Sequence, residues 1–189
     1  MQTRKEALVD SLVAYLLEHG LSDLSLRPLA AATGTSARLL IYHFESKEGL
    51  LTEVLESMQA RLRQSLSQLL ERKSANEQAK PPIRRLWDWA IAGKNYPYLK
   101  LLYELQILAI QNPAAYAQYL QRNAASWSDL VLALLPAQDR DPVFATLCIA
   151  VFDGLFIELM GTGDRRRTTQ AMDRFICLVG DARAHRPGT

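Results

Sequence analysis

The sequence predicts an all-α protein of about nine helices, with a small three-helix domain of helix-turn-helix type at its N-terminus and a larger helical bundle after it. Apolar residues recur at spacings of three and four along nearly the whole chain, whereas the alternation typical of strands is hard to find. Glycines, prolines and capping residues interrupt this pattern at helix-length intervals. With 189 residues, 49% of them hydrophobic, the chain can bury a sizeable core.

The first fifty residues contain signals for three short helices. Serines are favoured N-caps, and glycines stop helices because they adopt the backbone conformation that a helix end requires. The predicted helices are 7–17, stopped by Gly20; a second from Ser25 to Thr33 with Pro28 in its first turn, stopped by Gly34; and Ala37 to Phe44, opened by Ser36.

Prolines and capping residues mark most of the later helices. Proline is tolerated in the first turn of a helix, where its missing N–H has no intrahelical acceptor to lose. The polar segment 74–82 is predicted to be a linker near a domain boundary. The predicted helices are 47–73, capped by Ser46; 82–93; 97–111; 113–135, opened by Asn112; 142–160, opened by Asp141; and a last one from the cap Asp164 to about Ala184, after the break at 161–164.

The segment 26–44 has the composition of a helix, a tight turn and a second helix. Its apolar residues can pack on the first helix, and Gly34 supplies the turn. The second of these helices has only eight residues, which is too few for a stable isolated helix. A helix of that length suits insertion into the DNA major groove, which is about 12 Å wide. The pattern therefore indicates DNA binding, although the net charge of +2 does not select nucleic acid.

Several polar side chains on and beside the short helix are predicted DNA contacts. Arg38 can read guanine through O6 and N7, while Thr35 and Ser36 stand at the helix start, where hydroxyl and N–H groups bind phosphate. Arg27, Tyr42, His43 and Lys47 are predicted backbone contacts. Other interpretations stay open: Tyr42 and His43 can pack under the fourth helix, Arg38 can be a solvated charge, and Lys47 can complement a helix dipole.

The segment L-R-P-L-A-A-A-T-G-T-S-A-R-L-L-I-Y-H-F-E-S-K-E-G-L-L, residues 26–51, resembles the DNA-binding region of TetR-family transcriptional regulators. The sequence departs from the family pattern at four places. The family often carries Lys or Arg where Ala37 stands, which adds Ala37 to the expected contacts, a small residue at Arg38, Thr at Leu39 and Tyr at Ile41. The matching residues are Gly34, Ser36, Leu40, Tyr42, His43, Phe44, Ser46, Lys47, Glu48 and Leu50.

The resemblance implies a division of the chain and an assembly. Residues 1–50 form the DNA-binding domain, residues 51–189 form the ligand-binding and dimerisation domain, and the helix at about 47–73 connects them. The last two helices are expected to pair with those of a second copy in a four-helix bundle. The segment 143–160, apolar almost all round, agrees with a central or interfacial helix.

Aromatic residues of the second domain suggest a cavity for an apolar ligand. A cavity lined by Tyr and Trp suits a hydrophobic or aromatic effector, although such residues are also ordinary core. Glu104 and Glu158 stand in apolar sequences and are expected either to anchor a ligand or to pair with arginine. The predicted pocket residues are Trp87, Trp89, Tyr96, Tyr98, Tyr103, Glu104, Trp127 and Phe156.

Other functional classes find little support. Cys148 and Cys177 are predicted to be buried free thiols, because two cysteines without histidine companions make no zinc site. The three histidines form no catalytic arrangement, so no enzyme, cofactor or metal is expected. Without a signal peptide or an uncharged run of about 18 apolar residues, a cytoplasmic protein that does not contact membranes is expected.

The sequence as a whole favours a homodimeric repressor that binds double-stranded operator DNA and is released by a small hydrophobic effector. Two alternatives remain: a helical small-molecule or lipid-binding protein without DNA activity, and an enzyme with an aromatic cavity.

Overall fold

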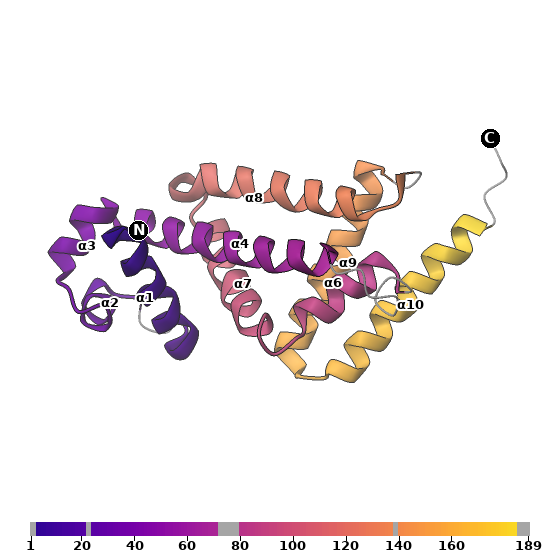
Figure 1. Ribbon diagram of the computed structural model, residues 1–189, viewed down its shortest axis with the longest axis horizontal. Coiled ribbons are helices and arrows are strands. Elements are labelled where there is room, and N and C mark those ends of the chain that lie inside the picture. Colours follow the sequence, from indigo (N-terminus) through magenta and orange to yellow (C-terminus); the bar gives the residue numbers. More distant parts are fainter. Residues whose placement is uncertain (1–2, 22–23, 72–79, 138–139, 185–189) are drawn as a thin grey trace. The chain divides into compact units, whose positions relative to one another are not determined.

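A computed structural model describes residues 3–21, 24–71, 80–137 and 140–184, and within these ranges the chain forms helices and no strand (Figure 1). The all-α prediction is confirmed. The helices are α1 (Arg4–His19), α2 (Leu26–Ala32), α3 (Ala37–Phe44), α4 (Lys47–Glu71), α6 (Pro82–Ala90), α7 (Tyr96–Gln111), α8 (Pro113–Leu134), α9 (Pro142–Thr162) and α10 (Arg165–Ala184).

Local signals set most helix ends, as the sequence predicts. Gly20 ends α1 with a positive φ of 69°, and Gly163 ends α9 with a φ of 70°. Ser36 Oγ accepts the N–H of Leu39 at 3.2 Å, while Ser25, before α2, makes no such bond. The other confirmed caps are Ser46, which accepts from Gly49, Asp141, which accepts from Val143 and Phe144, and Asp164, which accepts from Arg167. Most of the predicted linker at 74–82 lies outside the described residues.

The helices divide into two compact units. Unit one comprises Met1–Ser67 and Gly93–Arg122, and unit two comprises Gln68–Ala92 and Asn123–Thr189. The predicted division cuts the chain once, near residue 50, whereas the two units group residues that are close in space. As a result, α4 and α8 each have residues in both units. The functional division at residue 50 stays a prediction.

Unit one begins with a three-helix head formed by α1, α2 and α3. Leucines from all three helices meet in its core, and Leu12, Leu29 and Leu40 are each completely buried. Phe44, the last residue of α3, is only 4% exposed. The buried side of the eight-residue helix α3 therefore holds it against α1 and α2, which supplies the stability that so short a helix lacks alone.

The corner between α3 and α4 is tightly built. Glu45 has a left-handed φ of 66°, and the N–H of Ser46 donates to the carbonyl of Phe44 at 2.7 Å. A Cβ atom added to Gly49 would stand 2.2 Å from that same carbonyl oxygen. A side chain at Gly49 would clash with this backbone oxygen, so the first turn of α4 packs directly against the end of α3.

The turn between α2 and α3 buries a hydroxyl without a partner. Gly34 has a φ of 63°, and the N–H of Thr35 donates to the carbonyl of Ala30 at 2.9 Å. This places Thr35 Oγ1 inside the head, where it has no hydrogen-bond partner among the described residues. A buried hydroxyl without a partner destabilises the folded state.

The rest of unit one contains a polar contact between three helices. Gln59 of α4 donates through Nε2 to the hydroxyl of Tyr119 of α8 at 3.2 Å, and that hydroxyl donates to Gln106 Oε1 of α7 at 2.9 Å. Tyr119 is 3% exposed and Gln59 9%. Burial, with a smaller effect from Glu56, raises the pKa of Tyr119 above its usual range, so the phenol stays protonated and can donate.

Unit two packs α6, α9 and α10 with the later part of α8. Trp87 is fully buried, its Nε1 donates to Thr169 Oγ1 at 2.9 Å, and its ring meets Phe152 edge-on at 5.7 Å. Cys148 is buried here, as predicted. Cys177 is exposed, so the prediction that it is buried is wrong: it lies on the side of α10 that does not pack in this unit.

Replacing Thr35 by valine should stabilise the protein by about 1 kcal/mol, because valine has the same shape and removes the buried hydroxyl without a partner. Urea unfolding measures the change. Thr35→Ser, which keeps the hydroxyl and removes the methyl group, should be less stable than the wild type. A Thr35→Val variant that is less stable than the wild type would show that the hydroxyl has a partner.

Candidate nucleic-acid interface

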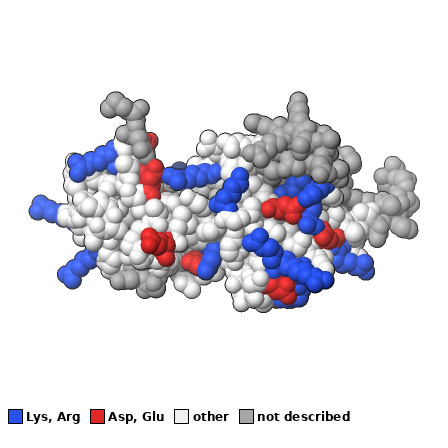
Figure 2. All heavy atoms as spheres, turned by 60° about the horizontal axis from the view of Figure 1, so that its bottom comes forward, with Lys and Arg blue, Asp and Glu red and all other residues white. Residues whose placement is uncertain are grey.

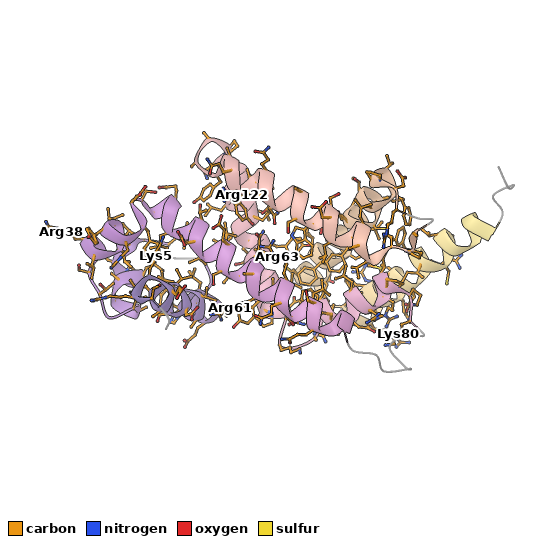
Figure 3. All side chains as sticks on the ribbon, turned by 45° about the horizontal axis from the view of Figure 1, so that its top comes forward. Lys5, Arg38, Arg61, Arg63, Lys80 and Arg122 are labelled. Carbon is orange, nitrogen blue, oxygen red and sulfur yellow. The ribbon has the colours of Figure 1, made fainter. Side chains whose placement is uncertain are left out.

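The outward side of α3 carries Arg38 and Tyr42, which stand four residues apart and therefore on the same side of the helix. Tyr42 is 79% exposed, the largest exposed fraction among the large hydrophobic side chains described. Arg38 is exposed and points away from the helices into solvent (Figure 3). Leu40 and Phe44 are buried on the opposite side, so the fold itself presents Arg38 and Tyr42.

The remaining predicted contacts differ in their exposure. Arg27 and Ser36 are exposed, whereas Ala37, His43 and Lys47 are half-buried. His43 lies edge-on to Tyr42, with ring centroids 5.4 Å apart. Thr35 presents no free hydroxyl, because its Oγ1 is buried. The structure thus places Arg27, Ser36, Arg38 and Tyr42 at the surface, and their contacts with DNA stay a prediction.

The charges of unit one fall into two groups. Lys5 pairs with Glu53, and Arg61 with Asp10, so these basic side chains are neutralised within the unit. No ion pair among the described residues involves Arg27, Arg38 or Lys47. Figure 2 shows Lys and Arg side chains projecting from the head, at the left of the view. Arg27, Arg38 and Lys47 therefore keep positive charges that no described ion pair neutralises.

Sequence reasoning missed two features of this region. Thr3 and Glu6 form a capping box at the start of α1: Thr3 Oγ1 accepts the Glu6 N–H at 3.2 Å, and Glu6 Oε2 accepts the Thr3 N–H at 2.7 Å. The spacing T-x-x-E before an apolar run is the signal that could have found it. Lys5 stands over the ring of Phe44 at 5.4 Å, a contact between residues 39 positions apart that no local pattern reveals.

The predicted pocket residues belong to both units. Tyr96, Tyr98, Tyr103 and Glu104 lie in unit one and are all half-buried. Glu104 Oε1 is 3.9 Å from Nζ of Lys100, which lies one turn earlier on α7. In unit two, Trp87, Trp89 and Phe156 are buried and Trp127 is half-buried. Their common role in a pocket stays a prediction.

Two other findings concern binding groups. Glu158 is exposed and pairs with Arg167 at 2.5 Å, which is the arginine pairing that the sequence left open for it. Among the described residues, no three His, Cys, Asp or Glu side chains gather in a group that could hold a metal ion.

The head matches a known family. Residues 5–54 match the family model described as bacterial regulatory proteins, tetR family. The chain matches no protein of curated function.

Solved structures share the fold along nearly the whole chain. A transcriptional regulator from Rhodococcus sp. Rha1 is 19% identical, with a TM-score of 0.74 and coverage of 95% of this chain and 97% of that one. A member of the TetR family from Streptomyces coelicolor A3 is 23% identical, with a TM-score of 0.66 and coverage of 92% and 98%. The multidrug binding protein EbrR complexed with ethidium is 22% identical, with a TM-score of 0.68 and coverage of 92% and 99%.

At these identities the structural likeness shows the fold alone, whereas the family match concerns residues 5–54. That match covers α1, α2, α3 and the first turns of α4, which are the elements that present Arg38 and Tyr42. Residues 5–54 therefore form a DNA-binding domain of the tetR family of bacterial regulatory proteins.

Proposed function

We propose that the protein is a homodimeric, cytoplasmic repressor that binds operator DNA through residues 1–50 and responds to a small hydrophobic effector bound by residues 51–189. The observation that carries the DNA-binding part is the exposure of Arg38 and Tyr42 on the face of α3 opposite its buried core. A purely ligand-binding helical protein has no need for such a face.

The exposed side of α9 supports the dimer. Six of its exposed residues follow one another at alternating spacings of four and three, which places them on one stripe of the helix. These six are apolar or glycine: Val143, Leu147, Ala150, Gly154, Ile157 and Gly161. The exposed polar residues Thr146 and Glu158 lie at the edges of the stripe. Val143 is 77% exposed, Leu147 48% and Ile157 51%. An exposed apolar stripe of this length marks an interaction surface.

The same helix is long and apolar enough to cross a membrane by length and composition, with a mean hydropathy of 2.1. Its other side, however, packs within unit two through Cys148, Phe152, Phe156 and Leu159. A helix with one packed side and one exposed apolar stripe is suited to a second protein copy. We therefore assign the stripe to the dimer interface.

The nature of the effector is inferred from the relatives and from the aromatic residues. EbrR, which shares the fold, has been crystallised with ethidium and with proflavin, both planar aromatic compounds. The predicted pocket residues of this chain are mainly aromatic, and aromatic linings suit such ligands. A ligand can release DNA only if it binds better to the conformation that does not fit the operator.

Replacement of Arg38 should reveal base reading. Arg38→Ala should weaken binding to a duplex that the wild type selects from a random-sequence library by about 1–3 kcal/mol, and relax the preference at one base position. Lys47→Ala should weaken all sequences alike and lower the salt slope by about one. An Arg38→Ala variant that keeps both the wild-type affinity and the wild-type preference at every base position would remove the base-reading role.

Disruption of the α9 stripe should separate the copies. Sedimentation of the wild type at micromolar concentration should show a dimer, and Gly154→Arg should give a monomer that no longer binds a two-half-site duplex tightly, because a charged side chain replaces a small apolar surface. Gln121→Arg, on an exposed residue of α8, is the matched control and should remain dimeric. A wild-type monomer that binds the palindrome tightly would contradict the proposal.

Hydrophobic ligands should stabilise the folded protein. Ethidium or proflavin at about 100 times its Kd should add roughly 2.7 kcal/mol to the free energy of unfolding and raise the Tm. The measurement is made without DNA, because both compounds also bind nucleic acid, and a nucleotide serves as the charged control. A screen in which only polar, highly charged metabolites shift the Tm would overturn the hydrophobic-effector proposal and leave DNA binding untouched.

A further inference from the structure

We propose that Lys5 is a positioning residue for DNA recognition, acting on the end of α3 through Phe44 and Glu53 and not through contact with the DNA. The inference rests on the proposed DNA-binding function of the head. Lys5 is in the first turns of α1, Phe44 is the last residue of α3, and Glu53 is in α4. One ammonium group therefore joins the three helices that meet around the corner.

The geometry of Lys5 engages its charge inside the protein. Its Nζ atom is 2.5 Å from Glu53 Oε1 and 5.4 Å from the centroid of the Phe44 ring. The side chains of Lys5 and Glu53 are each 41% exposed. A cation held between a carboxylate and a ring face would have to leave both partners to reach a phosphate, so the arrangement favours an internal role.

The two partners of Lys5 are themselves restrained. Phe44 is 4% exposed, and its carbonyl oxygen accepts the N–H of Ser46. The same oxygen would clash with any side chain at Gly49. The capping box of Thr3 and Glu6 fixes the backbone on both sides of Lys5. Because both ends of the contact are rigid, the contact can set the angle at which α3 leaves the head and hence the direction of Arg38.

The central test is substitution of each partner, measured at about 0.15 M salt, where distant charges are largely screened. Lys5→Met should lower affinity for the duplex selected by the wild type about fivefold, the combined scale of an exposed ion pair and a cation–π contact. Glu53→Gln should also lower it, and the double variant should resemble Lys5→Met alone, because both changes break one contact. Lys5→Arg should restore binding to within about twofold, since arginine keeps the charge over the ring.

If Lys5 instead contacts a DNA phosphate, the opposite results are expected. Lys5→Met would then lower the slope of affinity against salt by about one and weaken non-specific DNA equally, and Glu53→Gln would raise affinity by releasing the lysine. A positioning role instead leaves the salt slope unchanged and reduces the ratio of specific to non-specific affinity. Higher affinity in Glu53→Gln, or an unchanged ratio in Lys5→Met, would overturn the inference.

Control variants separate these effects from general loss of charge or stability. Arg61 and Asp10 also join α4 to α1, but outside the corner of α3. Arg61→Gln removes one positive charge from α4 and should leave the selected duplex bound as before. Circular dichroism and sedimentation confirm that each variant is folded and dimeric. A wild type that selects no duplex would defeat the proposed DNA binding itself, whereas equal binding by wild type and Lys5→Met would defeat only the role of Lys5.

Discussion

The corner where α3 meets α4 is the constraint on which the DNA-binding side depends. An isolated helix of eight residues is marginal in water, so α3 exists through what it buries. Burial of Leu40 and Phe44 contributes about 1.5–3 kcal/mol each. Against this, the left-handed backbone at Glu45 costs about 1 kcal/mol. The missing side chain at Gly49 lets the helices meet, and the outward direction of Arg38 follows from these buried contacts.

The helix that starts at this corner also takes part in a buried polar contact. Gln59 of α4, Gln106 of α7 and Tyr119 of α8 share one hydroxyl within unit one. Nearer the corner, burial and a smaller effect of Glu48 raise the pKa of Tyr116, at a non-helical residue within α8. Buried hydrogen bonds are costly to leave unmade. These bonds therefore hold α4, α7 and α8 together within unit one.

The helix α9 has one side that packs inside unit two and one side that is exposed, and its composition alone does not distinguish the two sides. Its 21 residues are apolar almost all round, which suits a membrane, a protein centre or an interface equally. The fold divides the helix into a side that packs against the aromatic cluster at Trp87 and a stripe of small and branched residues that stays exposed. Small residues such as Ala150 and Gly154 let a second helix approach closely, so the stripe suits a protein partner.

The sequence by itself determined the helices and most of their ends, because these depend on contacts between residues three to five positions apart. Ser36, Ser46, Asp141 and Asp164 cap the helices that they were predicted to open, and the segment around Gly34 identified the head. Only the tertiary structure decided which faces meet. It buried the hydroxyl of Thr35, exposed Cys177 and divided the aromatic residues between two units. It also brought Lys5 to Phe44 and Gln59 to Tyr119, because such contacts join residues about 40 to 60 positions apart, and local periodicity carries no information about a partner that distant.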